Sequence, residues 1–114
     1  MTVDPLKIPP HSIEAEQSVL GGLMIEPTAW DKVFSKVQES DFYRHEHRLL
    51  FNQMLKLSQQ DKPFDAVLLM EGLKSINELD NAGGEIYLYE LANNTPSVAN
   101  IAAYADIVRE KSVM

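Results

Sequence analysis

The fold of this chain is decided by one stretch near its start, Ile8-Pro-Pro-His-Ser-Ile-Glu-Ala-Glu-Gln-Ser-Val-Leu-Gly-Gly22. The two prolines interrupt regular structure, and Ser12 is a favoured residue for capping a helix that begins directly after it. A glycine inside that helix costs roughly 1 kcal/mol relative to alanine. The Gly21-Gly22 pair therefore predicts that another segment packs closely against this helix and compensates for the cost.

Apolar residues recur at helical spacing along the rest of the chain, and no segment shows the sustained alternation of a strand. Thr28 and Asp65 are suitable caps for two of the helices that follow. Trp30 and Phe34 are expected in the core, and Ile76 is expected to face inward. The spacing predicts helices over about 12–25, 29–38, 44–60, 66–76 and 84–93, and a last one from about 98 or 100 onward.

These elements predict an all-α fold, a compact bundle of about six helices. We expect residues 1–11, with Pro5, Pro9 and Pro10, to form an irregular lead-in, and residues 12–114 to form one helical domain. The last helix carries no stop signal before Met114, so we expect it to be truncated before a further helical segment.

The charge of the chain argues against a grip on phosphates. The formal net charge is −7, and residues 65–114 carry 3 Lys/Arg against 8 Asp/Glu. A nucleic-acid-binding face needs clustered basic residues, so we expect DNA contact by this domain to be weak. An acidic surface instead favours a basic protein partner. No apolar run approaches the roughly 20 residues of a membrane helix, and no cysteine is present to supply thiolate chemistry.

Few residues have a composition suited to catalysis. The chain has no GxxxxGK[ST] loop for a nucleotide and no GxSxG nucleophile motif. His45 and His47, near Asp41, leave open a small metal-dependent hydrolase. Residues two apart on a helix point about 200° away from each other, which separates the two imidazoles. We therefore expect His47 to be half-buried and structural, and His45 to be solvated.

Two features suggest a protein-binding surface. Tyr87 and Tyr89 point in different directions from one predicted helix, so at least one is expected near the surface, where tyrosines favour interfaces. The last helix is rich in small residues, including Ala102 and Ala105, which permit close packing of helices between subunits.

Four blocks of the sequence resemble the N-terminal domain of the bacterial replicative DNA helicase, the DnaB family. They occur in the order of that family and cover nearly the whole chain. The blocks are Pro9-Pro10-His-Ser-Ile-Glu-Ala-Glu-Gln-Ser-Val-Leu-Gly21; Asp41-Phe42-Tyr43 with His47 and Phe51; Gly83-Gly84 with Tyr87-Leu88 and Leu91; and Asn94-Thr95-Pro96-Ser97 with Asn100-Ile101 and Tyr104-Ala-Asp-Ile-Val-Arg109.

The resemblance implies a non-catalytic, all-helical collar domain of a hexameric ring helicase in the bacterial cytoplasm. In that family the last helix continues into a helical hairpin that pairs subunits into a trimer of dimers, and the collar binds the C-terminal helicase-binding domain of DNA primase. ATP and Mg²⁺ belong to a helicase domain that is absent from this chain, so no cofactor is expected here.

The resemblance implies that Glu14, Tyr87 and Glu90 are contacts for primase. The small residues Ala102 and Ala105 of the last helix are the expected contacts between subunits. The alternative function is a collar that contacts single-stranded DNA directly, which would require stacking aromatics beside a basic groove.

Overall fold

The computed structural model of the chain describes residues 8–114, so most of the predicted lead-in, residues 1–7, lies outside the described residues. Within residues 8–114 there are six α-helices and three short 3-10 helices, and there is no strand, which confirms the predicted all-α fold. The α-helices are α1 (Ile13–Ile25), α2 (Trp30–Phe34), α3 (His45–Gln59), α4 (Ala66–Ser75), α5 (Gly84–Asn93) and α6 (Ile101–Ser112), and the 3-10 helices are η2 (Pro27–Ala29), η3 (Glu39–Asp41) and η4 (Val98–Asn100). None of the described helices is long and apolar enough to cross a membrane.

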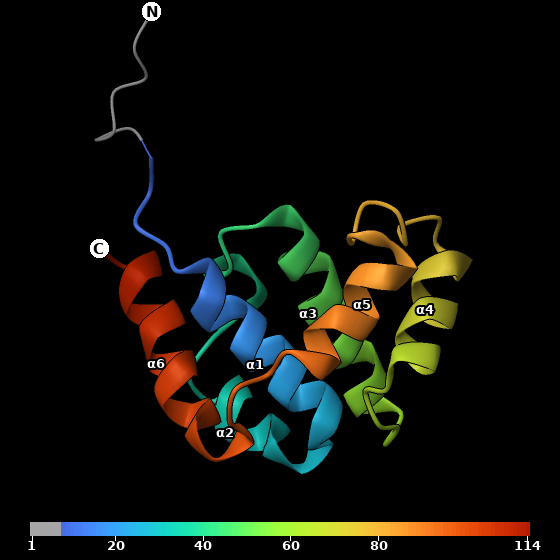
Figure 1. The fold of residues 1–114 in the computed structure, drawn as a ribbon, viewed down its shortest axis with the longest axis horizontal. Coiled ribbons are helices and arrows are strands. Elements are labelled where there is room, and N and C mark those ends of the chain that lie inside the picture. Colours follow the sequence, from blue (N-terminus) through green and yellow to red (C-terminus); the bar gives the residue numbers. More distant parts are fainter. Residues whose placement is uncertain (1–7) are drawn as a thin grey trace, which may run out of the picture.

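Helix α1 lies at the centre of the domain. Figure 1 shows α6 on one side of it and α5 on the other, with α3 behind, and its most extensive contacts are with α6 and α5. Most of the helix is therefore buried, including Val19, Leu20 and Leu23, which are fully inaccessible. As predicted, Ser12 caps α1, because its side chain accepts a hydrogen bond of 3.2 Å from the Ala15 N–H.

The two glycines of α1 allow the close contact that the sequence predicted. A Cβ atom on Gly21 would overlap the carbonyl oxygen of Leu91 and the hydroxyl of Thr95. A Cβ atom on Gly22 would lie 2.9 Å from Cδ1 of Ile101. The end of α5 and the start of α6 therefore both pack directly on the bare backbone of α1.

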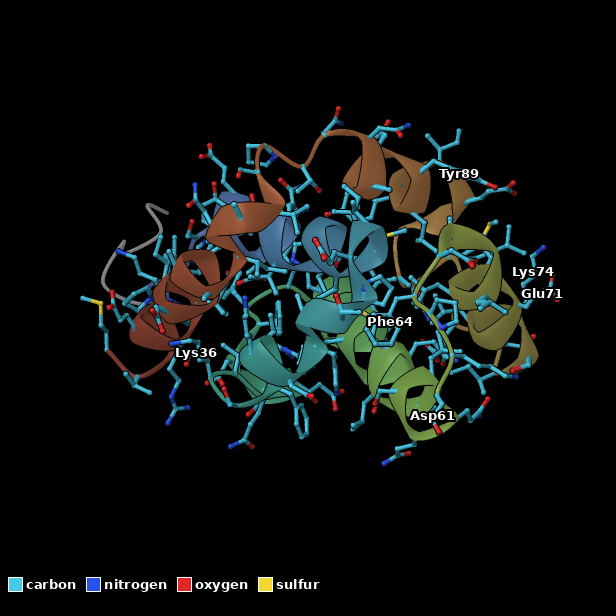
Figure 2. The ribbon with its side chains drawn as sticks, turned by 90° about the horizontal axis from the view of Figure 1, so that it is seen from below. Lys36, Asp61, Phe64, Glu71, Lys74 and Tyr89 are labelled. Atoms are coloured by element: carbon cyan, nitrogen blue, oxygen red, sulfur yellow. The ribbon has the colours of Figure 1, made fainter. Side chains whose placement is uncertain are left out.

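Aromatic rings fill the other half of the core. The ring of Phe51 lies 5.0 Å, centroid to centroid, from both Trp30 and Phe42. The ring of Phe64 meets Trp30 edge-on at 5.3 Å, and it lies in the interior (Figure 2). Such tilted and edge-on pairs each add about 0.5–1.5 kcal/mol beyond their buried area, and they join α2 both to α3 and to the α3–α4 connection.

The second predicted helix differs from the structure. Where one helix was expected over about 29–38, the chain forms η2 and then the short α2, which ends when the Ser35 hydroxyl bonds to the Lys32 carbonyl. Thr28 lies inside η2 and does not cap α2. Phe34 is 47% exposed and not in the core, because Trp30 occupies the interior and Phe34 stacks on its outer side.

The fourth helix also ends earlier than predicted. Asp65 caps α4 as expected, since its carboxylate accepts a hydrogen bond of 2.9 Å from the Leu68 N–H. Ile76, however, follows the end of α4 and is exposed, so it does not face inward. The prediction is correct for Leu73, which is fully buried, and wrong for Ile76, because the helix stops at Ser75.

The end of α6 is fixed to η3 through the buried carboxylate of Asp41. This carboxylate accepts hydrogen bonds from the Gln38 N–H at 2.7 Å, from the Arg109 guanidinium at 2.9 Å, and from the Ser112 hydroxyl. Burial alone raises the pKa of Asp41, but the hydrogen bonds of Ser112 and Gln38, together with the hydrogen bond and charge of Arg109, lower that pKa below its usual value.

We expect Gly21→Ala to lower the free energy of unfolding by about 1–3 kcal/mol, because the added methyl group meets a backbone carbonyl that cannot move freely. Gly72→Ala is the matched control, since Gly72 also lies inside a helix but a Cβ atom there meets only the flexible end of Gln53. That control is expected to change the free energy by less than about 1 kcal/mol. Urea unfolding followed by circular dichroism measures both, and equal effects would contradict the close contact.

We expect Asp41→Asn to lower the free energy of unfolding at neutral pH by about 1–3 kcal/mol, because hydrogen bonds to a charged group are lost. A folded pKa below the unfolded value, near 3.9, means that the stabilisation is complete above that pH and is lost as pH falls through the folded pKa. The difference between wild type and variant should therefore shrink below about pH 4, as measured by urea unfolding at a series of pH values.

Asp106→Asn serves as the control for this prediction. The Asp106 carboxylate is half-exposed and forms only a surface ion pair with Lys36 at 2.8 Å. Its loss is expected to cost less than about 1 kcal/mol. If the loss of unfolding free energy caused by Asp41→Asn did not change with pH, the Asp41 side chain would stabilise the fold through its packing and not through its charge.

Candidate functional site

A groove of about 480 Å³ lies between α1, α5 and α6. Its lining combines apolar and polar groups contributed by all three helices and by the connection after α5. The lining residues are Ser12, Glu14, Ala15, Gln17, Ser18, Tyr87, Glu90, Leu91, Asn94, Pro96, Tyr104 and Ile107. We refer to it below as the α1–α5–α6 groove.

The groove brings together the three residues that were expected to contact a partner. Glu14 comes from the first turn of α1, and Tyr87 and Glu90 come from α5. Glu14 and Glu90 are exposed, while Tyr87 is half-buried. Among residues 8–114, these two carboxylates are the only charged side chains in the lining, so the lining is acidic, and its apolar part includes Leu91, Pro96 and Ile107.

The hydroxyl of Tyr87 is fixed by hydrogen bonds at the edge of the groove. It accepts a bond of 3.1 Å from the side-chain amide of Gln17 and lies 2.6 Å from Nε2 of His47. The other ring nitrogen of His47, Nδ1, lies 2.7 Å from the Glu16 carboxylate. Tyr87 is therefore held in place from inside the domain, and its ring lies between the core and the groove.

The Glu16 carboxylate is buried together with His47, and it has a structural role that sequence reasoning did not find. It is 1% exposed and accepts further hydrogen bonds from the N–H groups of Tyr43, at 2.8 Å, and Arg44, at 3.4 Å. Glu16 lies in the first turn of α1, where the helix dipole alone would favour a carboxylate. The missed signal was its spacing, because Glu16 lies four residues before the buried Leu20 and thus on the apolar face of α1.

The three residues considered for a metal site do not converge. His47 is fully buried, deeper than the half-burial that was expected, and both its ring nitrogens are hydrogen-bonded to Glu16 and Tyr87. His45 is exposed, as predicted, and Asp41 is paired with Arg109. Across residues 8–114, no group of three or more potential ligands is arranged to bind a metal ion.

The small residues of α6 occupy different environments. Ala105 is fully buried in the core of this chain, so its methyl group is not available to a second subunit. It was expected at a subunit interface because of its small size, but it lies with Ile101 and Val108 on the face of α6 that packs into the core. Ala102 is half-buried and leaves part of its surface accessible.

Tyr89, the second tyrosine of α5, is 43% exposed and projects from the outer side of that helix (Figure 2).

The sequence matches one protein family over most of its length. Residues 8–110 match the model of the DnaB-like helicase N-terminal domain. The chain is 49% identical over 109 residues to the replicative DNA helicase DnaB of Haemophilus influenzae, covering 96% of the chain and 23% of that protein. It is 40% identical over 108 residues to the replicative DNA helicase DnaC of Bacillus subtilis, covering 95% of the chain and 24% of that protein.

A solved structure has the same fold. The N-terminal domain of DnaB helicase from Mycobacterium tuberculosis superposes with a TM-score of 0.88 at 37% identity, covering 92% of this chain and 76% of that one. The chain spans about a quarter of the length of the curated relatives it matches.

Proposed function

The chain belongs to the family of DnaB-like helicase N-terminal domains, and from this premise we propose that it docks DNA primase and assembles subunits of a hexameric replicative helicase. The domain is a non-catalytic part of that helicase. ATP and Mg²⁺ are expected to act in the helicase domain and not in this one, and we infer a bacterial cytoplasmic location from the role in replication.

We propose that the α1–α5–α6 groove receives the C-terminal helicase-binding domain of primase. The observation that carries this proposal is that the groove gathers Glu14, Tyr87 and Glu90 together with the apolar side chains of Leu91, Pro96 and Ile107. Two carboxylates with no basic neighbour in the lining favour a partner segment with Lys or Arg beside an apolar surface. Such complementarity raises the rate of encounter and selects against acidic partners.

Tyr87 is the strongest single candidate for a binding contact. A tyrosine loses little conformational freedom on binding, and here its hydroxyl is already fixed by Gln17 and His47. Tyrosines at the centre of an interface often contribute more than 1 kcal/mol. Glu14 on α1 and Glu90 on α5 are exposed acids of the same lining that can pair with basic side chains of a partner.

The alternative function, direct contact with single-stranded DNA, receives less support. The groove offers Tyr87 and Tyr104 as aromatic rings, but the only charges in its lining are those of Glu14 and Glu90. Negative charges repel phosphates, and binding of single strands needs a basic groove along the backbone. We therefore propose a protein ligand for this groove.

We further propose that subunits associate through the exposed side of α6, where Ala102 permits close approach of a second helix. The family membership implies oligomerisation in the replicative helicase. Ala105 is left out of this proposal because it is buried in the chain's own core.

We expect Tyr87→Ala to weaken binding of the purified primase C-terminal domain by at least about 1 kcal/mol, or roughly fivefold in Kd. Glu90→Lys should also weaken binding, with a larger effect at low salt because the charges are exposed. Isothermal titration measures both, with circular dichroism confirming that each variant remains helical.

Glu85→Lys is the matched control for charge, because Glu85 is an exposed acid of α5 outside the groove lining. It should bind primase like the wild type. Equal losses from Glu85→Lys and Glu90→Lys would indicate a general effect of net charge, and unchanged affinity of Tyr87→Ala would reject the role of Tyr87.

We expect the chain to self-associate in a concentration-dependent manner, and Ala102→Glu to shift it toward the monomer by placing a charge between helices. Ser75→Glu, at an exposed position on α4, should leave the mass unchanged. Light scattering on a sizing column measures this. A wild-type chain that stays monomeric at every concentration would reject association through this domain.

A further inference from the structure

A continuous series of hydrogen bonds crosses the domain, from the α1–α5–α6 groove to the segment of residues 42–44. It begins at Gln17 and Tyr87 in the groove, passes through the ring of His47 at 2.6 Å, and reaches the Glu16 carboxylate at 2.7 Å. The same carboxylate accepts the N–H of Tyr43 at 2.8 Å. His47 and Glu16 are 0% and 1% exposed, so no partner can touch them.

The direction of each hydrogen bond follows from the chemistry of the groups. A carboxylate only accepts, so Nδ1 of His47 carries the hydrogen that is donated to Glu16. With a neutral ring, Nε2 then accepts from the Tyr87 hydroxyl, and that hydroxyl accepts in turn from Gln17. Every donor has one acceptor in this arrangement. Loss of any member leaves a buried polar group without its partner, which is costly.

The segment of residues 42–44, at the end of the series away from the groove, carries one ring of an exposed aromatic pair. The ring of Tyr43 is 38% exposed and stacks on His11 with centroids 3.8 Å apart and planes at 9°. His11 is itself held to the chain by a contact of 2.8 Å between its Nδ1 and the Pro9 carbonyl oxygen. The position of the Tyr43 backbone therefore determines where residues 9–11 lie on the domain.

We propose that Glu16 and His47 are positioning residues, which fix Tyr87 in the groove and couple occupation of the groove to the 42–44 segment and the stacked His11. A partner that contacts the Tyr87 ring acts on a hydroxyl that is bonded to His47, and the two oxygens of Glu16 connect His47 to the N–H groups of Tyr43 and Arg44. The coupling is a property of this chain, and only the identity of the partner rests on the proposed function.

The first experiment uses the amide spectrum of the chain without any partner. Tyr87→Phe keeps the ring but removes the hydroxyl, and we expect the amide resonances of Tyr43 and Arg44 to shift, together with the ring resonances of His11. Tyr89→Phe is the matched control, because Tyr89 lies two residues away on the same helix and forms no hydrogen bond through its hydroxyl among the described residues. Its effects should stay within α5.

Gln17→Leu provides a second, milder variant, since it removes only the donor to Tyr87 and leaves His47 and Glu16 intact. It should shift the same resonances of residues 43 and 44 in the same direction. If both Tyr87→Phe and Gln17→Leu leave the Tyr43 and Arg44 amides unchanged, the coupling is overturned.

The second experiment measures binding of the primase C-terminal domain to Glu16→Gln, under conditions where circular dichroism shows a fully helical chain. We expect a loss of about 3- to 10-fold in affinity from a residue that the partner cannot reach. Unchanged affinity would overturn the positioning role. Failure of the wild type to bind primase would instead reject the proposed partner, while the amide test would still decide the coupling.

Discussion

The close approach of α1 to the end of α5 and the start of α6 is the constraint on which the rest of the structure depends. Gly21 and Gly22 remove the side chains that would separate these backbones, so Leu91 and Ile101 pack directly on α1. With α5 and α6 fixed on either side of the central helix (Figure 1), the groove between the three helices follows as a consequence. The same contact that organises the core therefore also creates the candidate binding site.

The interior of this domain is not purely apolar, and its buried polar groups are all satisfied. In residues 8–114, no buried side-chain nitrogen or oxygen lacks a hydrogen-bond partner. Glu16 and Asp41 each accept several hydrogen bonds from distant parts of the chain. An apolar residue in either place would pack, but it would not specify the position of the 42–44 segment or of the end of α6. These carboxylates thus favour one arrangement of the chain over other compact arrangements that apolar burial alone would allow.

The acidic character of the chain fits a domain that acts through geometry. Its net charge is −7, and the charged residues lining the groove are both carboxylates. The surrounding apolar lining supplies contact area, while the fixed ring of Tyr87 reduces the entropy lost on binding. The match to the DnaB-like helicase N-terminal domain and the TM-score of 0.88 to a solved relative show the family and the fold of the domain that carries this groove.

The sequence by itself determined the helical class, the cap at Ser12, the close packing at Gly21-Gly22 and the family, because these depend on local propensity and on motifs contiguous in the chain. Through the resemblance, the sequence also predicts Glu14, Tyr87 and Glu90 as partner contacts, and the folded chain brings these three residues into one groove. Tertiary structure alone decided which groups the buried Glu16 carboxylate bonds to, namely His47 and the N–H groups of Tyr43 and Arg44, and that Phe34 is exposed. Both depend on which distant parts of the chain meet in the fold, and local periodicity does not contain that information.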